Sequence, residues 1–169
     1  MDAIELLKQQ HQEVKDLFEQ IEEADEPEEK AELLQDLADN FAAHGTIEER
    51  IFYPAAYAES TREMLEEAVE EHLSAKRVLA DLLKMKPGDE NFDAKVKVLK
   101  EQIEHHVEEE EGELFPKVRT QFDANDLETM GEKMEELFDE LMSDSPSDDI
   151  PAETKKAAPI KPKRGRAGA

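Results

Sequence analysis

Four histidines and two glutamates recur at matched positions in two halves of the chain. The segment His44–Pro54 aligns without gaps on the segment His106–Pro116, because both read His-x-x-x-Glu-Glu-x-x-apolar-aromatic-Pro. A further histidine, His11 or His72, precedes each segment and is followed four residues later by a lysine. In a helix the His-x-x-x-Glu spacing places an imidazole and a carboxylate one turn apart on the same face. These residue types in this pattern indicate a metal site.

Two metal ions would remove an energetic cost that the pattern creates. If Glu48 and Glu110 were buried together without a cation, the cost of charge burial would add to like-charge repulsion. Imidazole and carboxylate ligands without sulfur suit iron. If each ion receives two histidines, an oxygen from each bridging glutamate and a shared oxo or hydroxo group, each keeps one octahedral position open for O2, NO or peroxide. The expected metal ligands are His11, His44, Glu48, His72, His106 and Glu110.

The second segment has a competing register. His105 and Glu109 are also one turn apart. Two features favour His106 with Glu110 instead. This register aligns Leu114–Pro116 with the corresponding residues of the first segment, and His106 continues the apolar stripe of its helix.

Several neighbouring residues have two interpretations. Glu49 and Glu111 are expected to support the ligands from outside or to face solvent. The tyrosines could act in redox chemistry or hydrogen bonding, although packing at the end of a bundle is the commoner role. The two matched lysines could place a donor near a bound anion, or could extend their ammonium groups to water. These alternatives concern Tyr53, Tyr57, Lys15 and Lys76.

The elements that must position the site are helices. Four stretches, at about residues 2–24, 27–57, 60–86 and 92–122, repeat apolar residues at steps of three and four, as core-facing helices do. A fifth amphipathic stretch has no histidine. Short connections favour antiparallel neighbours. The predicted fold is therefore all-α: an up-down-up-down antiparallel four-helix bundle with an additional short C-terminal helix and a disordered tail.

The predicted domain organisation follows from where the helical pattern ends. Residues 1–143 form the bundle domain, in which 1–122 is the metal-binding part and 125–143 the extra helix. The remainder, 144–169, is a basic segment rich in proline, alanine and lysine. It is expected to be disordered because it cannot bury a core of its own.

The composition narrows the classes of partner. The chain carries 45 acidic residues against 21 basic ones, a formal charge of −24, which repels a phosphate backbone and an anionic membrane surface. It has no cysteine, which excludes disulfides, thiolate nucleophiles and cysteine-bound metals. No apolar run is long enough to span a bilayer, and Met1–Leu7 does not have the pattern of a signal peptide. We therefore expect a cytoplasmic location and small molecules, rather than nucleic acid or membrane, as partners.

The paired His-x-x-x-Glu-Glu motif with its aromatic residue and proline resembles the hemerythrin-like family, also called the hemerythrin HHE cation-binding domain. The resemblance covers His11 to Pro116. It implies a four-helix bundle around a non-haem, oxygen-bridged di-iron centre, with the six ligands named above. Oxygen-carrying hemerythrins have a second histidine one turn after the third-helix histidine, where this chain has Lys76. Four histidines instead of five argue against simple reversible O2 carriage and favour sensing, peroxide or NO chemistry, or iron handling.

Three functions are compatible with these residues. The first is a di-iron protein that binds O2, NO or peroxide for sensing, storage or the handling of iron and oxidative stress. The second is an enzyme that uses the same centre to reduce peroxide or remove NO. The third is an interaction protein whose metal site is structural.

Overall fold

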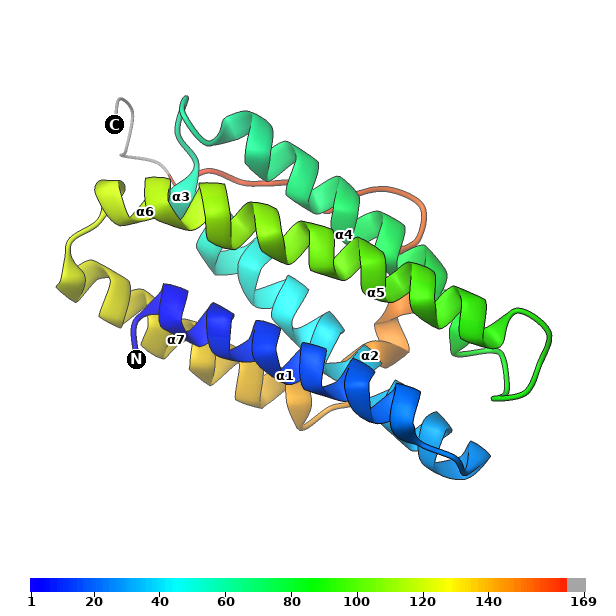
Figure 1. Ribbon diagram of the computed structural model, residues 1–169. Coiled ribbons are helices and arrows are strands. Elements are labelled where there is room, and N and C mark those ends of the chain that lie inside the picture. Colours follow the sequence, from blue (N-terminus) through cyan, green and yellow to red (C-terminus); the bar gives the residue numbers. More distant parts are fainter. Residues whose placement is uncertain (164–169) are drawn as a thin grey trace.

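The chain folds into helices, as the sequence predicts. The computed structural model describes residues 1–163, and no strand is present within them. Two pairs of long helices are in contact, α1 with α2 and α4 with α5, and α7 lies along α1 and α2 (Figure 1). The bounds are α1 (Ala3–Glu23), α2 (Pro27–Ile47), α4 (Arg62–Leu82), α5 (Phe92–Glu109) and α7 (Ala124–Met142). The all-α class is therefore confirmed.

Local sequence explains where several of these helices begin. At α1 the side chain of Asp2 accepts a hydrogen bond from the backbone N–H of Glu5, and the side chain of Glu5 accepts one from the N–H of Asp2. This reciprocal pair satisfies two backbone donors that a helix end leaves free. Pro27 lies in the first turn of α2, where its missing N–H costs no helical hydrogen bond. Asp123 caps α7 by accepting from a backbone N–H in its first turn.

The second and fourth predicted helices are interrupted, which corrects the expectation of continuous α-helices over 27–57 and 92–122. Each contains one π-helical turn at the same position of the repeat, followed by a short α-helix. The π turns span Glu48–Phe52 and Glu110–Leu114, and the short helices are α3 (Tyr53–Ala56) and α6 (Phe115–Gln121).

A proline explains both π turns. The rings of Pro54 and Pro116 would clash with the carbonyl four residues earlier in a regular α-helix, and neither residue has an N–H to donate. In the wider turn, the residue before each proline donates its N–H to the carbonyl five residues earlier, which belongs to Glu48 or to Glu110. The helix therefore widens at each predicted metal-binding glutamate.

The apolar core consists of two clusters separated by a polar layer. Along α1, Ile4 and Leu7 belong to the first cluster and Val14 and Phe18 to the second, with His11 between them. The other three long helices show the same division, because apolar residues of different clusters flank His44, His72 and His106. Packing on both sides therefore buries the layer that contains the histidines.

The extra helix α7 agrees with the predicted 125–143 to within one residue. Gly131 lies inside this helix, where glycine is unfavourable by about 1 kcal/mol relative to alanine. A Cβ atom at this position would collide with the carbonyl oxygen of Met1 and would lie 2.9 Å from the nitrogen of Ala3. The glycine thus permits close contact between α7 and the beginning of the chain.

The C-terminal segment, residues 144–163, differs from the expectation of a disordered tail. A 3-10 helix over Pro146–Glu153 packs against α2 and α4, and its Ile150 is 1% exposed within the second apolar cluster. The segment then runs back along the bundle (orange to red in Figure 1), and the N–H of Lys163 donates to the carbonyl of Pro54 in α3. Ala157 and Ile160 pack against the first cluster. The rest of the predicted tail, residues 164–169, lies outside the described residues.

No helix within residues 1–163 combines the length and the apolar character that crossing a lipid bilayer requires.

Candidate metal centre

The six predicted ligands meet in the polar layer, and all six are buried. Around Glu48, Nε2 of His44 lies 3.1 Å from Oε1 and Nε2 of His72 lies 3.1 Å from Oε2. One carboxylate therefore lies between an imidazole of α2 and an imidazole of α4.

Glu110 has the corresponding place in the other half of the repeat. Its Oε2 lies 3.2 Å from Nε2 of His11 in α1 and 3.5 Å from Nε2 of His106 in α5. The two halves also meet directly, because Nε2 of His72 lies 3.2 Å from Nε2 of His106.

The donor atoms fall into two overlapping groups. Within each group, the atoms all lie within 4.8 Å of one another. Glu48 belongs to both groups, as a carboxylate shared by two adjacent ions would. The first group is His11, His44, Glu48 and Glu110, and the second is Glu48, His72 and His106.

Each of the four imidazoles is also held from outside the centre. In every case Nδ1 lies 2.8–3.0 Å from a side-chain oxygen, so that Nε2 faces the carboxylates. Such contacts set the tautomer and the orientation of a metal-binding imidazole. The pairs are His11 with Glu111, His44 with Gln10, His72 with Glu49, and His106 with Glu71.

These outer oxygens extend the repeat. Glu49 and Glu111 each follow a predicted ligand, and each contacts a histidine of the other helix pair, as the first of their two interpretations expects. Sequence reasoning missed Gln10 and Glu71. A signal was present, because each of them comes immediately before a matched histidine, His11 or His72.

The buried atoms of the centre fit metal ions better than a hydrogen-bonded polar cluster. Nε2 of His11 and His44, Oε1 of Glu48 and Oε2 of Glu110 have no hydrogen-bond partner within the described part of the chain. Their short separations are not aligned as hydrogen bonds, so proximity alone does not satisfy these atoms. Two donors bound at right angles about 2.1 Å from one ion would be about 3.0 Å apart. The observed 3.1–3.2 Å is close to that separation.

The charges of the centre are linked to one another. Burial raises the pKa of Glu48, but the adjacent His44 and His72 hold it well below its usual range. Burial lowers the pKa of His72, but hydrogen bonds to Glu48 and Glu49 raise it to about 10. The metal-free centre therefore holds protons that bound cations would displace.

Tyr53 lies inside the centre, whereas the sequence favoured packing at the end of the bundle. Its hydroxyl donates to Oε1 of Glu110 at 2.7 Å and lies 3.2 Å from Oε2 of Glu48 and 3.4 Å from Nε2 of His72. Burial and the charges of both glutamates raise its pKa well above the usual value, so the phenol keeps its proton. The matched position in the other half is Phe115, so the repeat supplies one hydroxyl.

The competing histidine register lies at the surface. The side chain of His105 is 61% exposed, and its Nε2 lies 3.1 Å from Glu109 and 3.7 Å from Glu71. His106, by contrast, is buried among the other predicted ligands.

The matched lysines and the second tyrosine lie away from the donor atoms. The buried ammonium group of Lys76 lies 2.8 Å from Glu153 and 3.7 Å from Glu49. Lys15 is exposed beside a cavity that His11 also lines. Tyr57 packs against the first apolar cluster.

The sequence pattern of the hemerythrin HHE cation-binding domain matches residues 2–118, and the chain belongs to this family. A crystal structure of a hemerythrin HHE cation-binding domain-containing protein from Mycobacterium kansasii is similar, with a TM-score of 0.76 and 26% identity. The similarity covers 92% of this chain and 95% of that one.

A curated relative is a DNA nickase from a Nostoc species. It is 23% identical over 128 residues, which cover 76% of this chain and 36% of that protein. The matched part of this chain thus spans about a third of that relative's length.

Proposed function

We propose that this protein holds two iron ions in a non-haem, oxygen-bridged di-iron centre and binds O2, NO or peroxide there. One observation carries the proposal. All four imidazoles have Nδ1 engaged by an outer oxygen and Nε2 directed at two buried carboxylates. In the absence of sulfur ligands, this donor set suits iron.

The proposed division of ligands follows the two groups of donor atoms. His11 and His44 would hold one ion, His72 and His106 the other, with Glu48 and Glu110 between them. Bound iron would supply open positions where a small molecule can bind or be reduced. The four long helices would form the up-down-up-down bundle that the sequence predicts, and the apolar clusters would exclude bulk water.

The hydroxyl of Tyr53 gives the centre a proton donor. It is buried beside both carboxylates, and its raised pKa keeps the proton on the oxygen. A ligand with an acceptor atom near Glu110 could take this hydrogen bond in place of the carboxylate. The residue would thereby orient a bound molecule, and its replacement by phenylalanine would remove the donor at little change in volume.

The decisive experiment measures the iron content and the optical spectrum of aerobically purified protein. We expect two iron atoms per chain and near-ultraviolet charge-transfer absorption. His106→Ala should lose the paired site, while the matched variant His105→Ala should keep it because that side chain is exposed. Wild-type protein that stays free of iron after anaerobic loading with Fe(II) and reoxidation would contradict the proposal.

A second candidate is an enzyme that reduces peroxide or removes NO at the same centre. The buried phenol of Tyr53 favours it, because reduction of peroxide consumes protons that a neighbouring donor can deliver. Sustained peroxide consumption in the presence of an added electron donor, with a lower rate in Tyr53→Phe but no loss of iron, would support this function. Binding without turnover would support a sensing or storage role.

The third function, an interaction protein with a structural metal site, has less support. The segment that would reach a partner is packed against α2 and α4 over Pro146–Glu153. Nor do we extend DNA nicking to this chain, because its charge of −24 opposes contact with a phosphate backbone.

A further inference from the structure

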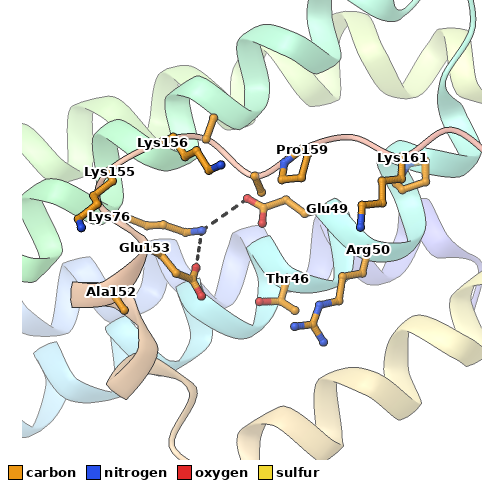
Figure 2. Close-up of a pocket in the computed structure, with 13 residues that line it drawn as sticks. Thr46, Glu49, Arg50, Lys76, Ala152, Glu153, Lys155, Lys156, Pro159 and Lys161 are labelled. Carbon is orange, nitrogen blue, oxygen red and sulfur yellow. Dashed lines mark hydrogen bonds and ion pairs between the residues drawn. The ribbon is translucent and has the colours of Figure 1, made fainter.

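A cavity of about 580 Å³ lies beside the centre, between the C-terminal segment and the helices α2, α3 and α4 (Figure 2). Five cationic side chains line it, against the carboxylates of Glu49 and Glu153. Its apolar wall contains Pro54, Ala157 and Pro159. The cations are Arg50, Lys76, Lys155, Lys156 and Lys161.

Four of these cations have no carboxylate within 4.0 Å among residues 1–163. Lys76 is the exception, because its ammonium group lies between Glu49 and Glu153, as Figure 2 shows. The rest of the lining set, Arg50, Lys155, Lys156 and Lys161, is exposed. In a chain with 45 acidic residues, four cations around one cavity with no acidic partner are unexpected.

These four cations are not needed to attach the C-terminal segment to the helices. Other contacts already hold the segment: the buried Ile150, the ion pair of Glu153 with Lys76, and hydrogen bonds from Arg77 to the carbonyls of Thr154 and Lys155. If the lysines bound the segment to the acidic helices, their ammonium groups would lie against carboxylates. They line a cavity instead.

We propose that this cavity binds a small organic molecule with two or more phosphate groups. Lysine and arginine are the side chains that bind phosphate, the arginine fork through paired hydrogen bonds. Several unpaired cations suit several negative charges, and the apolar wall suits the organic part. A molecule of nucleotide size fits the volume, because small-molecule sites span about 300–1,000 Å³.

The other half of the repeat provides a comparison cavity. About 370 Å³ in volume, it lies beside His11 and is lined by Lys8 and Lys15. Glu104, Glu108 and Glu111 line it too, so acids outnumber bases. A polyanion would be repelled there, which makes its two lysines a matched control.

The test is calorimetric titration of the purified full-length chain with ADP at about 0.15 M ionic strength, with iron content measured before and after. We expect ADP to bind more tightly than inorganic phosphate. Lys155→Gln/Lys156→Gln should weaken ADP binding about tenfold or more, because two charge-assisted contacts are lost. Lys8→Gln/Lys15→Gln removes the same charge and should leave the affinity within about twofold, since long-range effects are screened.

Three results would overturn the proposal: no binding of ADP at millimolar concentration, equal weakening in both double variants, or citrate binding as tightly as ADP through the same lysines. Absence of ADP binding would exclude the site. Equal weakening would mean that ADP responds only to the net charge of the protein, and equally tight citrate binding would mean that the cavity recognises carboxylates rather than phosphates. The site requires no iron, so these outcomes are independent of the di-iron proposal.

Discussion

The two halves of the repeat have the same inner contacts and different surroundings. Glu49 lies 2.8 Å from Nδ1 of His72, and its counterpart Glu111 lies 2.8 Å from Nδ1 of His11. The side chain of Glu49 is 11% exposed, however, and that of Glu111 is 36% exposed. The C-terminal segment covers the flank of the centre that contains Glu49.

The matched lysines differ between the two flanks because only one flank is covered by the C-terminal segment. Lys76 is 6% exposed and paired with Glu153 of the C-terminal segment, whereas Lys15 is exposed on the other flank. Neither reaches the donor atoms of the centre. The repeat therefore specifies a symmetric centre, while the C-terminal segment, which lies outside the repeat, decides which flank of the centre is covered.

The largest effect is expected when one metal-binding histidine is removed from either half, which tests whether the inner contacts of the two halves are equivalent. His72→Ala and His11→Ala should each lose the paired metal site, because each removes a donor from one of the two groups around Glu48. Metal analysis and the near-ultraviolet spectrum measure the loss. If one variant kept both ions while the other lost them, the two halves would not be equivalent in metal binding.

Removal of the C-terminal segment, which covers the flank that contains Glu49, should have a smaller effect, on the stability of the fold. Truncation after Asp144 removes the buried Ile150 and the partner of Lys76. Loss of a buried isoleucine and of the ion pair between Lys76 and Glu153 should reduce the free energy of unfolding by about 3 kcal/mol or more. The melting temperature should fall by roughly 10 °C.

The matched control for this truncation ends the chain at Lys163. It keeps every described contact of the C-terminal segment and should therefore melt above the chain that ends at Asp144. Equal melting of all three chains would show that the C-terminal segment contributes nothing to stability.

A change of one pH unit should have a still smaller effect, in this case on the affinity for metal. In the metal-free protein His72 has a pKa of about 10, above the ordinary 6.5, so it holds a proton at neutral pH. A metal must displace this proton, so affinity should rise as pH increases, by about tenfold per unit for each proton released. Calorimetric titration of Fe(II) in buffers of different ionisation enthalpy counts the protons. Binding without proton release at pH 7 would be the contrary result.

The smallest effect isolates the ion pair that distinguishes the two flanks. Glu153→Gln removes a partner of the buried Lys76 and should cost about 1 kcal/mol, since Glu153 is half-exposed and solvent screens the pair. Lys15→Gln, at the matched exposed position, should change the free energy of unfolding by less than about 0.5 kcal/mol. Denaturant unfolding at equal protein concentration compares the two, and equal effects would remove the distinction between the flanks.

Most of the helical fold could be predicted because it depends on short-range periodicity. The apolar steps of three and four located five helices to within a few residues, and His106 was preferred over His105 because it continues its stripe. The π turns at Glu48 and Glu110 could not be read from that periodicity. They result from a conflict between a proline ring and a carbonyl one turn earlier.

The packing of the C-terminal segment could not be predicted for a related reason. Ile150, Ala157 and Ile160 are too sparse to form a pattern, and each packs against side chains distant in the sequence. Their burial becomes favourable only after the helices have created the surface that receives them.

The sequence by itself determined the family, the helical class and the repeated set of histidines and glutamates, because spacing along one helix decides which side chains share a face. Tertiary structure alone decided which oxygen holds each Nδ1, that the hydroxyl of Tyr53 enters the centre, and that Lys76 is buried while Lys15 is not. These contacts join residues of different helices or of the C-terminal segment. Their geometry therefore depends on how the helices pack, which no local pattern contains.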